Sequence, residues 1–435
     1  MLITDAELPD GRVRDVRAED GRIADIAENL HSLPNEESVD ATGLTLLPGA
    51  IDVHVHFREP GHEQKETWAT GSRSAAAGGV TTVVDQPNTS PPTVDRERFD
   101  QKEAFAKNSL VNYGINGGVN ADWKPDELLE CPLFALGEVF LADSTGDMGI
   151  DAERFEAALA HAGEAAVPVT VHAEDADRFD ESALEGNTGG TGRDADADCW
   201  SQYRTAEAEI AAVEDACEVA RGAGANLHIA HTSTPEAVDI ASDAGVSCEV
   251  TPHHLLLSRD DLDDLGTFGR MNPPLRTEGR RQALYERVAD GTVDMIATDH
   301  APHTVTEKET DLESAPSGVP GVETMLPLLL QEVREERLTL DRVCELVSEG
   351  PAERFGLDRK GRVVEGYDAD LTLVDLDETE EIEGEALHSK CGWSPFEGRE
   401  AVFPEITVVG GAVVYDGRAG DRFTAGLGEN VRRNQ

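Results

Sequence analysis

Short apolar runs recur through the middle of the chain, and stretches rich in alanine and glutamate separate most of them. The runs have the length of buried strands, whereas intervening stretches such as 152–162 and 205–221 have a helical composition. Eight runs cover residues 51–56, 80–85, 111–116, 135–141, 167–172, 226–231, 246–250 and 293–298. Eight strands that alternate with helices predict an α/β fold, the (β/α)8 TIM barrel, with functional residues at the carboxyl ends of the strands.

Both ends of the chain have a different, β-rich pattern. Residues 12–16 and 22–26 alternate between apolar and polar types around Asp20 and Gly21, a pair typical of hairpin turns. Residues 361–376 and 406–416, near the other end of the chain, have a similar β-strand pattern. The sequence therefore predicts a small β-sandwich domain formed by residues 1–47 and 355–435, and a barrel formed by residues 48–354.

The first strand of the predicted barrel carries the most informative chemistry. His54 and His56 alternate with apolar residues, and successive side chains of a strand point to opposite faces. The two imidazoles therefore share one face, where they can bind one metal ion. A polar strand with two solvated histidines is the alternative interpretation.

Further metal-ligand side chains occur at other predicted strand ends. Nitrogen and carboxylate ligands without thiolates favour Zn²⁺, with Mn²⁺ or Co²⁺ as alternatives. Because six ligands exceed one tetrahedral site, we predict two zinc ions that share a carboxylate and a water. The predicted ligands are His54, His56, Glu138, His172, His231 and Asp299.

Composition excludes several functional classes. The 435 residues include 37 Lys+Arg and 87 Asp+Glu, and the net charge of −50 would repel nucleic acid and anionic membranes. Since the acid excess is spread along the chain and lysine is scarce, we predict a surface adapted to concentrated salt, in a halophilic cytoplasm. A disordered acidic protein is the alternative, which 39% hydrophobic residues disfavour.

The cysteines and the amino terminus indicate the compartment. The six cysteines are scattered and form no CxxC pair. We therefore expect them to be small buried residues of a protein in a reducing compartment. The sequence has no basic amino-terminal region and no long apolar run, so we expect neither a signal peptide nor a membrane anchor.

Several motifs, taken in order, resemble those of the dihydroorotases of the amidohydrolase superfamily. The resemblance implies a zinc-dependent cyclic amidohydrolase that reversibly closes N-carbamoyl-L-aspartate to dihydroorotate in pyrimidine synthesis. It also implies a cytoplasmic homodimer and, as in some relatives, association with aspartate transcarbamoylase. The motifs lie at 48–61, 85–89, 171–175, 228–233, 249–255, 271–276, 297–303 and 318–324.

A substrate carboxylate would distinguish this chain from relatives that act on uncharged rings. Arg58 lies two residues beyond His56, on the same strand face, and its guanidinium could bind a carboxylate through two hydrogen bonds. Allantoinases usually have a neutral residue here. A surface ion pair between Arg58 and Glu59 or Glu63 is the alternative interpretation.

The resemblance also implies the remaining substrate contacts and the catalytic group. Asn88 and His303 match the family's other carboxylate contacts, with His56 beside them. Asn272 and the backbone of Ser317 and Gly318 match its contacts to the ring amides. Asp299 is expected to carry the proton between the attacking or leaving oxygen and the ring nitrogen.

One position departs from the family pattern. Many relatives have a carbamate-modified lysine on the fourth strand as the bridging ligand, and here Glu138 stands at that place. Glutamate is already a carboxylate but is several atoms shorter. We therefore expect either a strand that lies closer to the metal ions or a weaker second ion. Asp143 is the fallback ligand, and a third reading is that neither residue binds metal.

Other functions and residues remain open. A hydantoinase, dihydropyrimidinase or allantoinase would keep the barrel and change the substrate, and a catalytically inactive scaffold would have lost ligands that are present here. Either His253 or His254 could orient a ligand, and the polar loop 303–320 could form a lid. Isolated histidines predicted at the surface are His31, His62, His161 and His388.

Overall fold

The centre of the protein is a barrel of eight parallel strands. The computed structural model describes residues 1–142, 148–187, 189–424 and 428–433. Each predicted apolar run overlaps one barrel strand, which confirms the predicted fold. The strands are β6 (Ala50–Val55), β7 (Val80–Asp85), β8 (Asn112–Ile115), β9 (Leu136–Phe140), β10 (Val169–His172), β11 (Leu227–Ile229), β12 (Ser247–Val250) and β13 (Met295–Ile296).

Backbone bridges close the barrel into a ring. Backbone hydrogen bonds link β6, β7 and β8 in one sheet. They link β9, β10, β11, β12 and β13 in a second sheet. A bridge between Gly117 and Leu136 joins β8 to β9, and a bridge between Val55 and His300 joins β6 to the segment after β13. All residues of these strands are buried, because side chains fill the inside and helices cover the outside. This explains why the strands appear as continuous apolar runs in the sequence.

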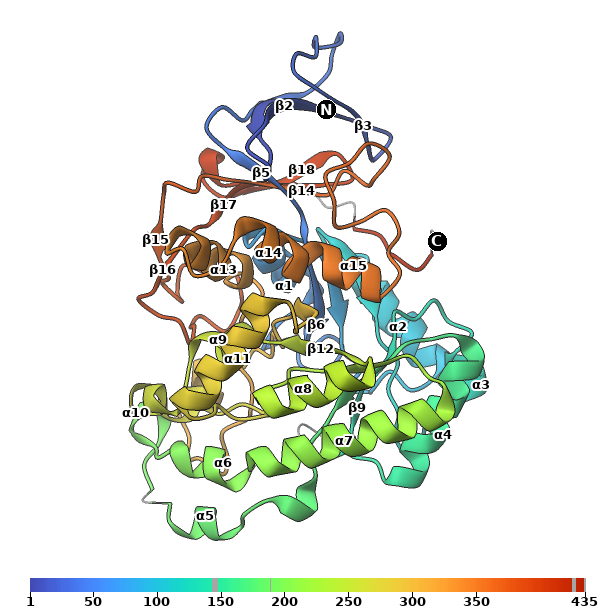
Figure 1. The fold of residues 1–435 in the computed structure, drawn as a ribbon, viewed down its shortest axis with the longest axis vertical. Coiled ribbons are helices and arrows are strands. Elements are labelled where there is room, and N and C mark those ends of the chain that lie inside the picture. Colours follow the sequence, from blue (N-terminus) through green and yellow to red (C-terminus); the bar gives the residue numbers. More distant parts are fainter. Residues whose placement is uncertain (143–147, 188, 425–427, 434–435) are drawn as a thin grey trace.

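Helices surround the barrel, as Figure 1 shows. Shorter helices α5 (Ser182–Glu185), α6 (Asp198–Tyr203), α9 (Pro252–Leu256), α10 (Leu262–Leu265) and α12 (Val305–Lys308) lie in the connecting loops. The outer helices are α1 (Trp68–Ala77), α2 (Arg96–Ala106), α3 (Pro125–Leu128), α4 (Ala152–Ala165), α7 (Ala206–Ala223), α8 (Pro235–Ala244), α11 (Glu278–Asp290), α13 (Met325–Arg334), α14 (Leu340–Cys344) and α15 (Gly350–Arg354).

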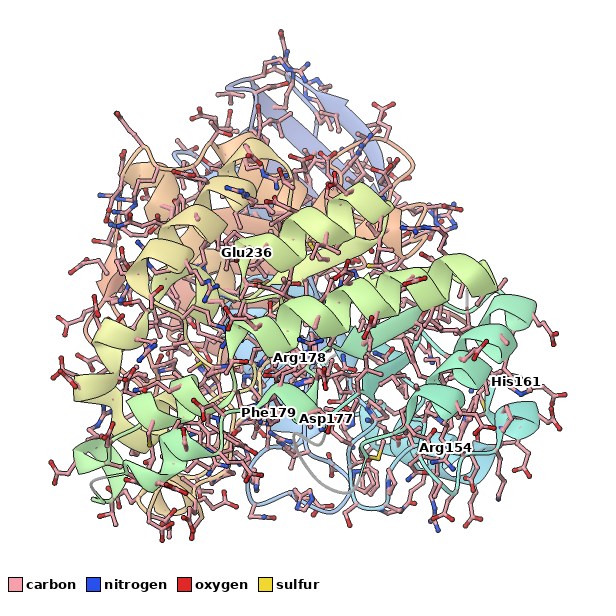
Figure 2. The ribbon with its side chains drawn as sticks, turned by 60° about the horizontal axis from the view of Figure 1, so that its bottom comes forward. Arg154, His161, Asp177, Arg178, Phe179 and Glu236 are labelled. Atoms are coloured by element: carbon pink, nitrogen blue, oxygen red, sulfur yellow. The ribbon has the colours of Figure 1, made fainter. Side chains whose placement is uncertain are left out.

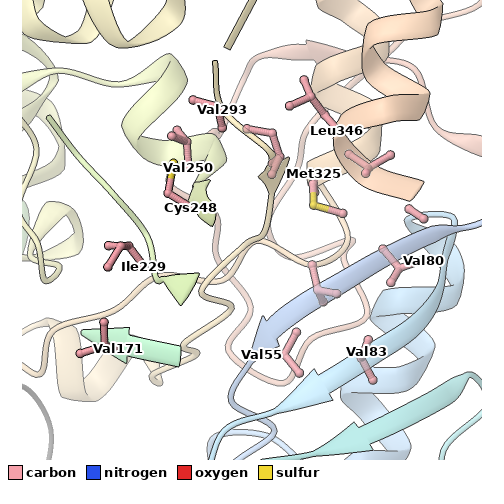
Figure 3. Close-up of a cluster of buried hydrophobic side chains, with 14 of the residues drawn as sticks. Val55, Val80, Val83, Val171, Ile229, Cys248, Val250, Val293, Met325 and Leu346 are labelled. Atoms are coloured by element: carbon pink, nitrogen blue, oxygen red, sulfur yellow. The ribbon is translucent and has the colours of Figure 1, made fainter. Parts of the chain in front are cut away.

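The main core lies between the strands and the helices that cover them. Figure 3 shows Val55, Val80 and Val83 of the first two barrel strands near Met325 and Leu346 of the later helical segments. All of them are buried. Burial of such side chains contributes roughly 1.5–3 kcal/mol each, so the core holds the strand ends in fixed positions.

Strands from both ends of the chain form one sheet, drawn at the top of Figure 1. Side chains of β1 to β3 pack against those of β14 and β17 in one apolar cluster, so the sheet folds over itself as the predicted sandwich. The sheet contains β1 (Leu2–Glu7), β2 (Val13–Glu19), β3 (Arg22–Ala27), β4 (Ser38–Asp40), β5 (Thr45–Pro48), β14 (Leu371–Val374), β17 (Pro404–Val409), β18 (Ala412–Asp416) and β19 (Arg422–Phe423), and a separate pair is β15 (Glu380–Glu381) with β16 (Glu400–Ala401).

The predicted hairpin joins β2 and β3 of this sheet. The strands pair as antiparallel neighbours, and Asp20 and Gly21 have φ values of 49° and 78°. Positive φ at both central positions is the geometry of the turns that favour such residues.

Residues 428–433 leave the sheet and return to the barrel. The amide of Val431 donates to the carbonyl of Tyr113 at 2.9 Å, and Arg433 forms an ion pair with Glu103 of α2 at 2.6 Å. The domain boundaries derived from the sequence stay a prediction, which limited proteolysis would check.

The isolated histidines differ in exposure. His31 and His161 are exposed, and Figure 2 shows His161 on the outer helix α4. The expectation of a surface residue is wrong for His388, which is half-buried and whose Nδ1 lies 2.7 Å from Oε1 of Glu323. Across the described residues, no helix combines the length and apolar character needed to cross a membrane.

Candidate metal centre and substrate pocket

His54 of β6 and His56, which directly follows this strand, lie side by side at the mouth of the barrel. Their ring centroids are 5.4 Å apart, in agreement with the shared strand face. His54 Nδ1 lies 2.6 Å from Oε1 of Glu249, and His56 Nε2 lies 2.9 Å from Oδ1 of Asp299. The end of β6 and the segment after β13 are neighbours in the closed barrel. Closure of the barrel therefore places Asp299 beside the two histidines, although it is distant from them in the sequence.

Glu138 lies at the centre of the predicted ligands. Its Oε1 is 2.6 Å from Nε2 of His231 and 3.0 Å from Nδ1 of His172, and its Oε2 is 3.3 Å from Nε2 of His54. One carboxylate therefore reaches histidines at or just beyond the ends of three strands. Asp143 lies outside the described residues.

The donor set fits a metal ion. Two groups have potential ligand atoms within 4.8 Å of one another: His54 with Glu138 and His231, and His54 with His56 and Asp299. Nε2 of His54 and Nδ1 of His231 are buried and have no hydrogen-bond partner among the described residues. Unpaired buried polar atoms are costly, and a cation coordinated by imidazole and carboxylate would remove that cost.

The charges of the cluster lead to the same conclusion. Burial favours the neutral acid, yet the histidines His231 and His54 hold the pKa of Glu138 well below its ordinary value. Burial also opposes the charged form of His172, but hydrogen bonds to Glu138 and Glu174 raise its pKa to about 9. The buried carboxylates are therefore stable only beside positive charge. Either protonated histidines or bound metal ions can provide that charge.

Two carboxylates behind the cluster fix the orientation of its histidines. Glu249 contacts His54 and also lies 3.0 Å from Nε2 of His228. Glu174 lies 2.7 Å from Nε2 of His172 and forms an ion pair with the buried guanidinium of Arg204 at 2.5 Å. Such carboxylates determine which ring nitrogen is turned to a metal ion.

Several site residues have an unusual backbone conformation. The φ angles of Arg58, His231 and Asp299 are 64°, 33° and 45°. Positive φ is uncommon outside glycine, and it clusters where function requires a particular side-chain direction. The folded barrel imposes these conformations, and the sequence alone does not reveal them.

A small cavity lies beside the ligand cluster. Its volume is about 20 Å³, room for about one water molecule, so a larger ligand requires the side chains and loops around it to move apart. The residues that line it combine the cluster with predicted substrate contacts, namely His56, Arg58, Glu138, Phe140, His172, His231, Asn272, Asp299, Ala301, Ser317 and Gly318.

Of the predicted carboxylate contacts, Arg58 and His56 line this cavity. Arg58 is 5% exposed, and its Nη2 lies 3.3 Å from Nε2 of His303. This burial is inconsistent with a surface ion pair to Glu59 or Glu63. Asn88 and His303 do not line the cavity, and Oδ1 of Asn88 lies 2.8 Å from Nδ1 of His56.

The predicted ring-amide contacts are held by neighbouring loops. Oδ1 of Asn272 accepts a hydrogen bond from Nε1 of Trp200 at 2.9 Å. The carbonyl of Gly318 accepts one from Nζ of Lys308 at 3.0 Å, and Lys308 also donates to the carbonyls of Arg270 and Pro316. The loop 303–320 is therefore packed onto the pocket in this structure.

Other histidines near the mouth have structural contacts. His254 Nε2 lies 2.9 Å from the carbonyl oxygen of Pro273. His253 is buried in α9, and burial holds its pKa well below the ordinary value. The backbone amide of Gly321 donates to Nδ1 of His300 at 3.1 Å, in agreement with a structural role for His300.

Sequence reasoning missed the groups that support the site. Glu249 was a detectable candidate, since it is a lone charge in the otherwise uncharged run 246–250. Lys65 and Lys102 gave no comparable signal, because a lysine in a loop or an outer helix is normally solvated. Near the site, the amino group of Lys102 is fully buried and that of Lys65 is mostly buried.

Comparisons with known proteins agree with this geometry. Residues 45–413 match the model of the amidohydrolase family. A dihydroorotase of Halobacterium salinarum is 58% identical over 99% of this chain and 100% of its own length. A dihydroorotase of Methanosarcina mazei is 46% identical, with 91% and 89% covered.

Solved structures share the fold. An L-hydantoinase (dihydropyrimidinase) from Arthrobacter aurescens has a TM-score of 0.89 and 27% identity, with 95% of this chain and 96% of that chain covered. A D-hydantoinase (dihydropyrimidinase) from Thermus has a TM-score of 0.86 and 28% identity, with 99% and 98% covered. The fold, the ligand cluster and the full-length likeness lead to one conclusion: this chain belongs to the dihydroorotases, metal-dependent cyclic amidohydrolases of the amidohydrolase family.

Proposed function

We propose that the protein reversibly cyclises N-carbamoyl-L-aspartate to dihydroorotate and water, as a step of pyrimidine synthesis. The observation that carries the proposal is the buried guanidinium of Arg58 at the wall of the cavity, whose Nε has no partner among the described residues. A buried cation needs an anionic partner. The carboxylate of dihydroorotate would be such a partner, and the name of the relatives supports this substrate.

We infer that two zinc ions bind to the ligand cluster. His54, His56 and Asp299 would hold one ion, His172 and His231 the other, and Glu138 would bridge them. This division follows the distances around Glu138, and a native carboxylate needs no carbon dioxide to become a ligand. When bound, the ions would provide a Lewis acid that activates water and stabilises negative charge on the reacting carbonyl.

We infer that Asp299 moves the proton. Burial favours its neutral form, but the hydrogen bond from His56 and nearby histidine charge hold the pKa of Asp299 at about 2. The side chain is therefore an ionised base at neutral pH. In ring closure it takes the proton of the carbamoyl nitrogen and returns it to the leaving carboxylate oxygen, which departs as hydroxide and becomes water with one further proton from solvent. Ring opening reverses these transfers.

Other residues of the chain would orient the substrate. Arg58 binds its carboxylate, with His56, Asn88 and His303 beside it. Asn272 and the backbone of Ser317 and Gly318 would hold the ring amides, so that the reacting carbonyl lies over the ligand cluster.

The decisive experiment measures ring closure of N-carbamoyl-L-aspartate by the zinc-loaded protein in molar KCl, with hydantoin and allantoin tested in parallel. Selective turnover of N-carbamoyl-L-aspartate is expected. Turnover of an uncharged ring instead would favour a hydantoinase or allantoinase, the alternative that the solved neighbours suggest. Absence of all turnover with metal bound would favour a scaffold.

The acidic surface supports a second proposal, a cytoplasm rich in salt. A net charge of −50 destabilises the fold through self-repulsion unless salt screens it, so the midpoint of thermal unfolding should rise with KCl. The homodimer and the association with aspartate transcarbamoylase stay predictions, which light scattering of the protein alone and with that enzyme would check.

A further inference from the structure

Behind the proposed carboxylate site lies a lysine that the activity does not explain. Lys65 follows the first barrel strand, and its Nζ lies 3.0 Å from Nδ1 of His303. The side chain of Lys65 is 14% exposed, and it also forms an ion pair with Glu307 at 3.0 Å. His303 itself is 1% exposed. The contact therefore places a mostly buried ammonium group against a fully buried imidazole.

The chemistry of this contact determines where the imidazole hydrogen lies. An ammonium group has only donors, so Nδ1 of His303 must accept from it. A neutral imidazole then carries its hydrogen on Nε2. Burial and the charges of Arg58 and Lys65 hold the pKa of His303 well below its ordinary value, so the ring is neutral. Nε2 donates to the carbonyl of Ser317 at 2.9 Å.

The geometry on the other side of the ring has a consequence for ligands. Nη2 of Arg58 lies 3.3 Å from Nε2 of His303, and both groups are donors. They cannot satisfy each other, and the single hydrogen on Nε2 is donated to the carbonyl of Ser317, so a ligand here would share or take over that hydrogen beside the donors of Arg58. Two oxygens of one carboxylate would match such a pair of donors.

We propose that Lys65 is a positioning residue for the substrate carboxylate: it fixes His303 as an Nε2 donor beside Arg58. This inference rests on the proposed function, because it needs a substrate with a carboxylate. Lys65 acts through His303 and does not touch the substrate. It would therefore contribute to selection of an acidic ring over an uncharged one.

A simpler role for Lys65 would be to hold α12 through Glu307. Glu307 caps that helix by accepting from the amide of Thr304. Glutamine preserves this cap but removes the charge that pairs with Lys65. The variant Glu307→Gln is therefore a matched control that disturbs the ion pair and leaves the contact between Lys65 and His303 in place.

The first test compares steady-state kinetics of zinc-loaded variants on dihydroorotate. For Lys65→Met we expect KM to rise about tenfold or more with kcat within about twofold, whereas Lys65→Arg, which retains a charged donor, should recover most of the loss. In a His303→Ala background, Lys65→Met should have no further effect. An equal effect in that background, or the same loss in Glu307→Gln, would overturn the proposal.

A second measurement needs no activity. Long-range proton–nitrogen NMR correlations of the metal-loaded protein identify the protonated nitrogen of His303, with its signals assigned by their loss in His303→Gln. We expect hydrogen on Nε2 in the unmodified protein and a mixture of both forms in Lys65→Met. Hydrogen on Nδ1 in the unmodified protein would refute the inference. If the protein has no dihydroorotate turnover, the proposed function fails, and this measurement still decides the role of Lys65.

Discussion

Oε1 of Glu249 lies 2.6 Å from Nδ1 of His54, and this contact turns Nε2 of the same ring towards Glu138 and Asp299. Loss of such a carboxylate typically lowers metal affinity 10–100-fold. We expect Glu249→Gln to weaken zinc binding by about that factor, measured by competition with a chelator. Glu236→Gln, at the exposed position shown in Figure 2, should leave the affinity unchanged. Equal affinities of both variants would disprove an orienting role for Glu249.

Replacement of Arg58 should change substrate preference. Charge-assisted hydrogen bonds contribute about 1.5–3 kcal/mol each, so Arg58→Met should lower kcat/KM on dihydroorotate by about 100-fold. Any turnover of an uncharged ring should persist. Arg154→Met, on the outer helix α4 in Figure 2, provides a control. If Arg58→Met affected charged and uncharged rings alike, its role would be structural.

Glu138 should determine how many ions the protein holds. The isosteric change Glu138→Gln removes the charge that lies between His54, His172 and His231, and we expect it to release about one zinc ion per chain and to abolish activity. Elemental analysis after gel filtration measures the ion content, with Glu153→Gln at an exposed position as control. Unchanged zinc content would exclude Glu138 from the ligand set.

A buried ion pair supports the loop that carries Arg58. Nζ of Lys102 lies 2.5 Å from Oδ2 of Asp85, and Oδ1 of Asp85 accepts from the amide of Phe57 at 2.5 Å. Lys102→Met leaves a buried carboxylate unpaired, which should lower the free energy of unfolding by about 3–5 kcal/mol. Denaturant titration measures this loss.

The double variant tests the origin of that loss. Because Lys102→Met combined with Asp85→Asn removes both charges, it should be more stable than Lys102→Met alone. A double variant as unstable as the single one would show that lost packing, and not the unpaired charge, causes the effect.

His254 should make the protein less stable in acid. Burial lowers the pKa of His254 to about 4, whereas an unfolded histidine has a pKa of about 6.5. As the pH falls from 6.5 to 4, the unfolded chain binds a proton that the folded state does not, so stability is lost in that window. Between pH 7 and pH 5 the loss is about 2 kcal/mol.

The variant His254→Gln isolates this contribution from other titrating groups. Denaturant titrations in high salt at both pH values should show a dependence on pH that is shallower by about 2 kcal/mol than in the unmodified protein. Identical dependence in both proteins would mean that folding leaves the pKa of His254 unchanged.

The sequence revealed the barrel because its strands are buried on both faces and therefore appear as uniform apolar runs. The last strand could be predicted for the same reason, although only Met295 and Ile296 form β13. The hairpin at Asp20 and Gly21 was predictable from turn chemistry alone. Local rules thus determined the elements and, through their alternation, the architecture.

Contacts between distant residues were not predictable in this way. Lys65 and His303 are 238 residues apart, and Glu249 and His54 are 195 apart. The local sequence around each of these residues does not indicate its partner, because closure of the barrel determines which residues meet. The left-handed backbone of Asp299 arises for the same reason, since it depends on the segment that follows β13.

The sheet built from both chain ends has a consequence for synthesis of the protein. Leu46 of β5 pairs with Leu373 of β14, so a ribosome must make almost the whole chain before β5 finds this neighbour. Until then, β5 keeps an open edge, and open edges invite pairing with other nascent chains. The neighbour of β5 on its other side, β1, carries the exposed acidic residues Asp5 and Glu7, whose repulsion of other acidic chains would protect the waiting sheet from aggregation until the last strands arrive.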